Sequence, residues 1–273
     1  MVVLVSFPPD KRPASMTEHH SASQRKIGII GAGKIGCAIY EALAEMAGVE
    51  ISYMLAGRRR PEGVPEALIL TDMAQALARD VDLVIEAAVP EVIHDHGAAI
   101  LAKSDLCGFS CTALSVQQTE QALRTACATH GTRFFVPHGA VLALDGLADG
   151  RDVIERVSIT TIKSGPSLGL SETAEGAVFE GSAREACLTF PRNVNVHAAV
   201  ALAGLGFDRT VSRVVAEPGK KTMEHHIHVE GQGLEWDIRV ASQSLGGVSG
   251  AYTPRSAVGT VRRILGGAGV TIA

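Results

Sequence analysis

The chain has 273 residues, which is enough for one large domain or two domains of moderate size. It is 46% hydrophobic with 29 glycines and only 4% aromatic residues, which suits an α/β protein with tight turns better than a β-sandwich. A net charge of −4 provides no basic surface for general nucleic-acid binding, and no apolar run reaches the roughly 18 residues of a membrane span, so neither partner is expected.

The cysteines are odd in number and scattered. There are five of them, and no two form a C-x-x-C pair. This usage is typical of a reduced protein rather than of a disulfide framework or a zinc site. We therefore expect a cytoplasmic protein without a bound metal.

Strands and helices are predicted to alternate in the first half of the chain. Residues 1–24 are rich in Pro, Ser, His and charge, and we expect them to form a disordered tail. Beyond this tail, apolar runs predict strands at 26–30, 49–55, 82–88 and 133–136, and helices at 35–46, 72–78, 90–102 and within 112–129. This alternation predicts an α/β fold with a doubly wound parallel sheet over residues 25–140.

The pattern changes after about residue 140. Here we predict strands at 153–163, 210–216, 223–230 and 234–242, a loop at 164–175, and helical residues at 182–205 that are interrupted at Pro191. Several strands with a few helices predict a second, α+β domain over residues 141–254 for substrate binding, catalysis and dimerisation. A last helix at the start of 255–273 is expected to pack back on the first domain.

A glycine-rich turn follows the first predicted strand. Gly31-Ala32-Gly33-Lys34-Ile35-Gly36 matches G-x-G-x-x-G between a strand and a helix. Gly31 permits the tight turn, Gly33 lets a pyrophosphate approach the backbone, and Gly36 lets the helix lie close to the sheet. The N–H groups that begin the helix would then bind the phosphates. The motif predicts a Rossmann domain that binds a nicotinamide dinucleotide, and the alternative is a glycine-rich turn without a ligand.

Arginines stand where many dinucleotide sites carry an acid. The second predicted strand is followed by Gly57, Arg58, Arg59 and Arg60. An acid there would bind the adenosine ribose hydroxyls, whereas Arg58 and Arg59 would pair with a 2′-phosphate. We expect the chain to accept NADP as well as NAD. The alternative is a solvated loop.

Two small residues end the buried strand at 82–88. Ala87 and Ala88 would leave room for the nicotinamide ribose at the carboxyl end of a parallel strand. Plain close packing of strand and helix is the alternative.

Three histidines share one predicted strand. Alternation places His225 on one face and His226 and His228 on the other. His225 suits an acid/base role, because the free pKa of histidine is about 6.5. A metal pair from His226 and His228 is an alternative, although the spacing matches no zinc motif. Three surface histidines are the third interpretation.

Polar residues elsewhere are candidates for ligand contacts. Asn193 and Asn195 precede a helical run, so both could be helix caps, and Asn195 could also turn its amide to a nicotinamide carboxamide. Arg255 could clamp a carboxylate or lie on the surface. His197, on an apolar helix, is more often a satisfied core histidine than a ligand.

Several segments resemble the L-aspartate dehydrogenase family. They are 179–186, 190–196 (Phe-Pro-Arg-Asn-Val-Asn-Val), 201–206 and 225–231, and the resemblance spans roughly residues 26–270. It implies reversible, NAD(P)-dependent deamination of L-aspartate to iminoaspartate, then to oxaloacetate and ammonia, by a homodimer. It implies His225 as the catalytic residue, with Ala140 and Asn195 as nicotinamide contacts. Asn193, His226 and Arg255 are further candidates for substrate contacts.

The chain departs from the family pattern at three places. Met223 stands where Asn is usual, His138 where Ser is usual, and Thr253-Pro-Arg-Ser256 where Asn-Pro-Lys-Thr is common. We expect these residues to lie near the substrate pocket. Two alternatives therefore stay open: a reductase of another small dicarboxylate or imine, as in the related dihydrodipicolinate and homoserine reductions, and a dinucleotide-sensing protein without catalysis.

Overall fold

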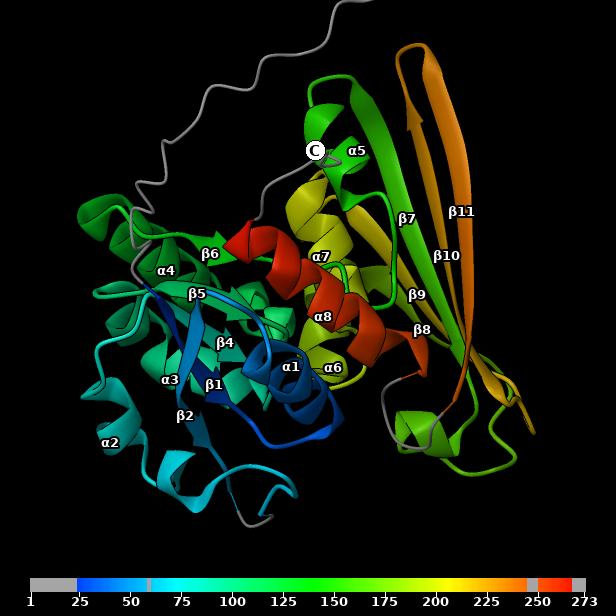
Figure 1. Cartoon of the computed structure of the whole chain (residues 1–273). Helices are drawn as coiled ribbons and strands as arrows, with labels where there is room; N and C mark the ends of the chain where they lie inside the picture. Colours follow the sequence, from blue (N-terminus) through cyan, green and yellow to red (C-terminus); the bar gives the residue numbers. More distant parts are fainter. Residues whose placement is uncertain (1–23, 58–59, 245–249, 267–273) are drawn as a thin grey trace, which may run out of the picture.

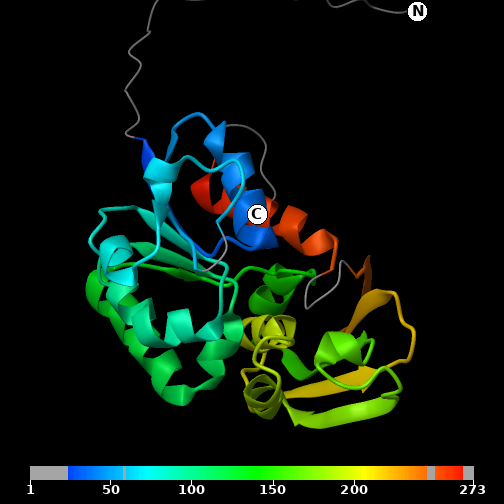
Figure 2. The same ribbon diagram turned by 90° about the horizontal axis from the view of Figure 1, so that it is seen from below.

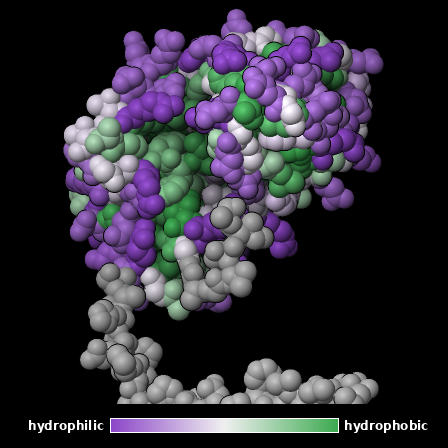
Figure 3. Space-filling view, turned by 90° about the horizontal axis from the view of Figure 1, so that it is seen from above, coloured by the Kyte–Doolittle hydropathy of each residue, from purple (hydrophilic) through white to green (hydrophobic). Residues whose placement is uncertain are grey.

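The computed structural model describes residues 24–57, 60–244 and 250–266, which form two sheets with their helices. The expected tail at 1–24, apart from Gln24, lies outside these residues, as do Arg58, Arg59 and the end of 255–273. The two sheets lie beside each other (Figure 1). On the face shown in Figure 3, hydrophobic side chains line a hollow between two more hydrophilic regions.

The first sheet is entirely parallel, in the order β3-β2-β1-β4-β5-β6. Its strands are β1 (Arg25–Ile30), β2 (Val49–Leu55), β3 (Ile69–Leu70), β4 (Leu83–Glu86), β5 (Asp105–Gly108) and β6 (Phe134–Phe135). The strand order reverses between β1 and β4. In such sheets a ligand binds in the crevice beyond the carboxyl ends of the strands at this point.

Helices cover both faces of the first sheet. They are α1 (Lys34–Ala44), α2 (Met73–Leu77), α3 (Pro90–Leu101) and α4 (Gln117–His130), with short 3₁₀ turns at η1 (Glu66–Leu68) and η2 (Cys111–Ser115). Ile27 and Ile29 of β1 are buried with α1, whereas Ile30 is buried with α3 and α4 on the other face. This arrangement confirms the doubly wound α/β fold, because alternate side chains of one strand serve opposite faces.

The second sheet is mixed, in the order β11-β10-β7-β9-β8. Its strands are β7 (Ile154–Lys163), β8 (Gly176–Ser182), β9 (Thr210–Ala216), β10 (Thr222–Gly231) and β11 (Leu234–Gln243). Only β7 and β9 run parallel. The helices α5 (Leu144–Asp149), α6 (Ala183–Thr189) and α7 (Asn195–Ala203) and the turn η3 (Pro166–Leu168) accompany it. Figures 1 and 2 show the described helices on the side of this sheet that faces the first.

The last helix, α8 (Tyr252–Leu265), lies against α1 in both ribbon views (Figures 1 and 2). Ala257 and Val261 join the core beneath α1. The helix begins before the expected Arg255, because Pro254 falls in its first turn and removes no intrahelical hydrogen bond there.

Sequence patterns missed four of the described elements besides the 3₁₀ turns, and the first of them is β3, a strand of only two residues. The strand β5 has only four residues, and it is recognised as a strand through its pairing with β4 and β6. The strand β8 carries a register shift between Ala177 and Phe179, and α5 has only six residues. The interruption at Pro191 is confirmed, since it separates α6 from α7. None of the helices described here is long and apolar enough to cross a membrane.

Candidate active site

The glycine turn has the geometry of a dinucleotide-binding loop. Gly31 has a φ of +110°, and a Cβ there would lie 2.5 Å from the Ala87 carbonyl oxygen. A Cβ on Gly36 would lie 1.9 Å from the Gly31 oxygen. By contrast, a Cβ on Gly33 would meet nothing within 4 Å. Gly33 is also the N-cap of α1 and has no side chain to cap the helix, so the turn offers open space and backbone N–H groups to an anion.

A continuous cleft leads from this turn to the second sheet. Its outer part is lined by Gly33, Lys34, Ile35, Ala87, Ala88, Pro90, Phe109, Ser110, Arg192 and Asn195. Its inner part is lined by Ile35, Phe109, Pro137, His138, Gly139, Ala140, Lys163, Arg192, Asn193, Asn195, Val196, Met223, His225, Ser242, Gly250 and Thr253. Ile35, Phe109, Arg192 and Asn195 belong to both parts. The cleft therefore brings together His225 and these predicted cofactor residues: Gly33, Lys34, Ile35, Ala87, Ala88, Ala140 and Asn195.

A buried carboxylate, which sequence reasoning missed, shapes the outer part. Glu86 ends β4 with no exposed surface, and it accepts hydrogen bonds from Ala88 N (2.7 Å), Ser110 N (3.0 Å) and Ser110 Oγ (2.8 Å). Burial raises its pKa to about 6. Glu86 thus ties two loops that line the cleft. The available signal was an acid at the end of an apolar strand.

The two predicted nicotinamide contacts lie between the sheets. Ala140 is buried and lines the inner part, where the Ser256 hydroxyl donates to the neighbouring Gly139 carbonyl. Asn195 begins α7 rather than capping it, since the N-cap is Val194. Its Oδ1 accepts a hydrogen bond from Thr112 N at 3.1 Å, while the Thr112 hydroxyl, which also lies 3.1 Å from Oδ1, donates its proton to the Pro191 carbonyl at 2.6 Å. The Asn195 amide group is therefore left as a hydrogen-bond donor for a ligand.

His225 points to the core side of β10, on the opposite face from His226 and His228, as the alternation predicts. It is 4% exposed, and its Nδ1 lies 2.8 Å from Thr161 Oγ1 on β7. Burial, with the nearby charges of Lys163 and His226, lowers the His225 pKa to about 3. His225 is therefore a neutral imidazole, and its second nitrogen, Nε2, is the one available to the pocket.

Lys163 is a second ionisable group of the inner part that sequence reasoning missed. It is 2% exposed, and its Nζ donates to the Asn193 carbonyl at 3.1 Å. Burial lowers its pKa to about 8. Alternation along β7 places Lys163 on the same face as the buried Ile159 and Thr161. A lysine on that inward face was the signal that could have identified it.

Two weaker candidates for substrate contacts lie outside the cleft. His226 points to the outer face of the second sheet, because neighbouring strand residues face opposite sides. Arg255 is exposed, while Thr253 and Ser256 of the same helix point inward. Residues two apart on a helix face different directions, so Thr253 lines the pocket and Arg255 does not. Among the described residues, neither candidate occupies the expected position.

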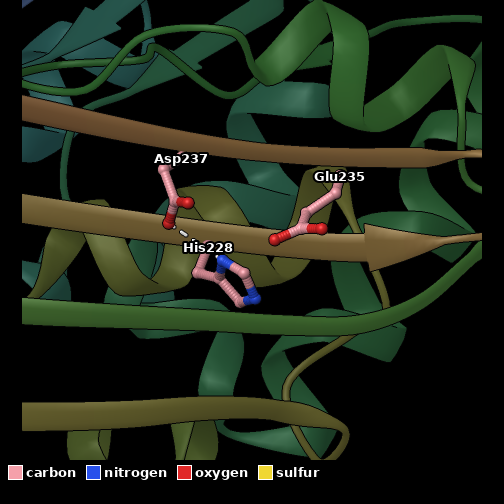
Figure 4. Close-up of side chains that lie close together, drawn as sticks. All are labelled: His228, Glu235 and Asp237. Atoms are coloured by element: carbon pink, nitrogen blue, oxygen red, sulfur yellow. Dashed lines mark hydrogen bonds and ion pairs between the residues drawn. The ribbon is translucent and has the colours of Figure 1, made fainter.

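The outer face of the second sheet carries ion pairs. Glu224 is 8% exposed and contacts Lys220 Nζ (2.9 Å) and Arg239 (2.8 Å), which lower its pKa to about 2. Of the two histidines in the alternative metal pair, His228 lies close to Glu235 and Asp237, with one possible ligand atom of each within 4.8 Å of the others (Figure 4). Both ring nitrogens of His228 are already paired, with Asp237 Oδ1 at 2.8 Å and Glu230 Oε1 at 2.9 Å. We interpret this group as a surface charge network.

The three departures from the family pattern do lie at the pocket. His138, Met223 and Thr253 all line its inner part. His138 Nδ1 bonds to the Val141 carbonyl at 2.9 Å, and burial followed by the charge of Arg263 lowers the His138 pKa.

Comparisons with known proteins match both halves of this architecture. Residues 31–137 match the model of the homoserine dehydrogenase NAD-binding domain, and residues 145–264 match that of the aspartate dehydrogenase C-terminal region. The L-aspartate dehydrogenase of Serratia proteamaculans is 31% identical over 262 residues, covering 89% of this chain and 98% of that protein. This chain belongs to the L-aspartate dehydrogenase family.

Other members agree with the assignment. The L-aspartate dehydrogenase of Archaeoglobus fulgidus is 33% identical, over 80% of this chain and 88% of its own length. The crystal structure of aspartate dehydrogenase from Thermotoga maritima superposes with a TM-score of 0.71 at 26% identity, covering 90% of this chain and 99% of that one. The family assignment predicted from the sequence is thus confirmed, and so is the NAD-binding character of the first domain.

Proposed function

We propose that this chain catalyses the reversible, NAD(P)-dependent deamination of L-aspartate to iminoaspartate, and then to oxaloacetate and ammonia. Residues 25–140 bind the dinucleotide and residues 141–254 supply the catalytic groups. The observation that carries the proposal is the single cleft that joins the open Gly33 turn to a buried pocket holding His225 and Lys163.

The residues of the outer cleft fit a dinucleotide. The turn Gly31–Gly36 would bind the pyrophosphate, Ala87 and Ala88 would flank the ribose, and Ala140 and Asn195 would contact the nicotinamide. When bound, the nicotinamide ring takes the hydride from the substrate α-carbon. We propose that NADP is accepted as well as NAD, because Arg58, Arg59 and Arg60 follow β2 without an acid.

His225 acts as the base in this proposal. A neutral imidazole with a lone pair on Nε2 can take a proton from the water that attacks the imine carbon. The water oxygen then bonds to that carbon, its proton moves to Nε2, and the electron pair of the C=N π bond moves onto the nitrogen, which later leaves as ammonia. The lowered pKa keeps His225 neutral at working pH, so its Nε2 lone pair carries no proton before the reaction, and the same burial makes the ring a weaker base than a free histidine.

Charges in the inner part suit a dicarboxylate with an amino group. Lys163 is a buried cation at the pocket wall and Arg192 is an exposed one, so each can face one carboxylate. Asn193 Oδ1 is buried and has no hydrogen-bond partner among the described residues. We assign it as an acceptor for the substrate ammonium.

The test is NADP and NAD reduction with L-aspartate at alkaline pH, followed by absorbance. We expect activity in the wild type and a loss of about 10²- to 10⁴-fold in His225→Ala. His226→Ala, on the outer face of the same strand, is the matched control and should stay near wild type. Tight NADPH binding without turnover of aspartate would sink the proposal. A substrate panel of small dicarboxylates and imines would then separate another reductase from a sensor.

We also propose a cytoplasmic homodimer that associates through the outer face of the second sheet. No helix of the described chain covers that face (Figure 1), and all five cysteines are free thiols. Light scattering coupled to size exclusion would measure the molar mass, and a monomer at micromolar concentration would contradict the dimer.

A further inference from the structure

Three buried side chains, Thr161, His197 and Ser212, connect His225 to the interior of the second domain. His225 Nδ1 lies 2.8 Å from Thr161 Oγ1, Thr161 Oγ1 lies 2.6 Å from His197 Nε2, and His197 Nδ1 lies 2.5 Å from Ser212 Oγ. They come from β10, β7, α7 and β9, and none is more than 4% exposed. A chain of polar groups so deeply buried must be satisfied internally, because no solvent can replace its hydrogen bonds.

The Thr161 hydroxyl has one proton and two histidine partners. It can donate to only one of them, so it must accept from the other. Burial lowers the pKa of both His225 and His197, and both rings are therefore neutral with one proton each. If His225 donates from Nδ1, His197 must accept at Nε2 and carry its proton on Nδ1. If His225 accepts at Nδ1, both protons sit on Nε2. The geometry thus forces the two histidines into the same tautomer.

We propose that His197, acting through the Thr161 hydroxyl, positions the His225 ring and holds it in the tautomer with the proton on Nδ1 and the lone pair on Nε2. His225 Nδ1–H donates to Thr161, Thr161 O–H donates to His197 Nε2, and His197 Nδ1–H donates to Ser212 Oγ. The catalytic use of that lone pair rests on the proposed function. Thr161 and His197 are positioning residues, since they act through His225.

The tautomers can be measured without turnover. Long-range ¹H–¹⁵N correlation spectra of the full chain, labelled with ¹⁵N-histidine, report which ring nitrogen carries the proton. His225→Gln and His197→Gln identify the two sets of signals. We expect both rings to carry the proton on Nδ1. Different tautomers, or both protons on Nε2, would overturn the proposal, whether or not aspartate proves to be the substrate.

Kinetics provide the second arm. Thr161→Val removes the hydroxyl at nearly constant volume, Thr161→Ser keeps it, and Thr160→Val makes the same change on the opposite face of β7. We expect Thr161→Val to lower kcat about 10- to 100-fold, as losses of groups that orient a catalytic ring do, with the NADPH Kd unchanged. The kcat of Thr161→Ser and of Thr160→Val should stay within about threefold of wild type.

An unchanged kcat in Thr161→Val, or no rescue by serine, would refute the positioning role. Absence of turnover in the wild type would instead refute the proposed function, and the tautomer spectra would still decide this proposal.

Discussion

Asn195 and Thr112 are 83 positions apart, and a hydrogen bond joins them across the two parts of the molecule. The Asn195 Oδ1 accepts from the backbone N–H of Thr112, which lies in η2 of the first part. This contact holds α7 against the first sheet and orients the remaining amide hydrogens. One side chain therefore combines a structural acceptor with a donor for a ligand.

Two substitutions separate these roles of Asn195. Asn195→Asp keeps an acceptor for Thr112 but has no amide hydrogens, so we expect unchanged stability and NADPH binding weaker by about tenfold. Asn195→Ala removes both the acceptor for Thr112 and the amide hydrogens. We expect it to weaken NADPH binding and also to lower the free energy of unfolding by about 1–3 kcal/mol. Urea unfolding and NADPH titration measure the two effects. Equal NADPH affinity in wild type and Asn195→Asp would contradict the ligand role.

The glycines of the turn differ in what an added methyl group would meet. Gly36→Ala places a Cβ 1.9 Å from the Gly31 oxygen, so the backbone must move. We expect a loss of about 1–3 kcal/mol of stability. Gly33→Ala meets nothing within 4 Å. It should fold like the wild type and bind NADPH at least about tenfold more weakly, because the methyl group fills the pyrophosphate space. Thermal unfolding with and without NADPH distinguishes the two variants, and normal NADPH binding by Gly33→Ala would argue against this position for the cofactor.

Glu86 should make stability depend on pH. Its pKa is about 6 in the folded chain against 4.5 as the ordinary value, so the folded state holds the proton more tightly. Protonated Glu86 therefore contributes about 2 kcal/mol to the free energy of unfolding. This contribution is fully present below pH 4.5 and is lost as pH rises through 6.

The comparison is between wild type and Glu86→Gln, in urea unfolding at pH 4.5 and 7.5. The difference in free energy of unfolding between wild type and Glu86→Gln should change by about 2 kcal/mol between the two pH values, because glutamine does not titrate. Glu86→Gln also replaces one of the two carboxyl oxygens with an NH2 group, so either the Ala88 or the Ser110 N–H group loses its acceptor, and the variant should be less stable at both pH values. Parallel pH profiles would show that the carboxyl does not titrate in this range.

Lys163 should make dicarboxylate binding depend on pH. With a pKa of about 8, its ammonium loses its charge above that value, while the neighbouring His225 and His197 are already neutral. We expect the affinity for succinate, which has no amine, to fall up to about tenfold per pH unit above pH 8.

Lys163→Arg is the control, because a guanidinium stays charged throughout this range. Its affinity for succinate should be flat between pH 7 and 9.5, as measured by competition with aspartate at saturating NADP. A flat profile in the wild type would exclude Lys163 as the carboxylate partner.

Local sequence pattern was sufficient to predict much of the fold of this protein. The G-x-G-x-x-G turn, the alternation of strands with helices and the doubly wound sheet follow from short-range periodicity and from glycine conformation. The placement of His225 on the opposite face from His226 and His228 follows from the two-residue period of a strand, and burial in the folded chain shows that the His225 face is the inward one. The pattern failed at β5 and β8, where pairing with neighbouring strands makes short or irregular segments into strands.

The sequence by itself therefore determined the fold class, the dinucleotide turn and the family. Only the tertiary structure decided the chemistry around His225. Thr161, Lys163 and His197 come from two different elements, and their meeting depends on how β7, β10 and α7 pack together. Tertiary contacts also placed Arg255 outside the cleft and buried Glu86 beside it. The reason is that burial and hydrogen bonding between distant segments set the direction of a side chain and its pKa, and neither is encoded in local spacing.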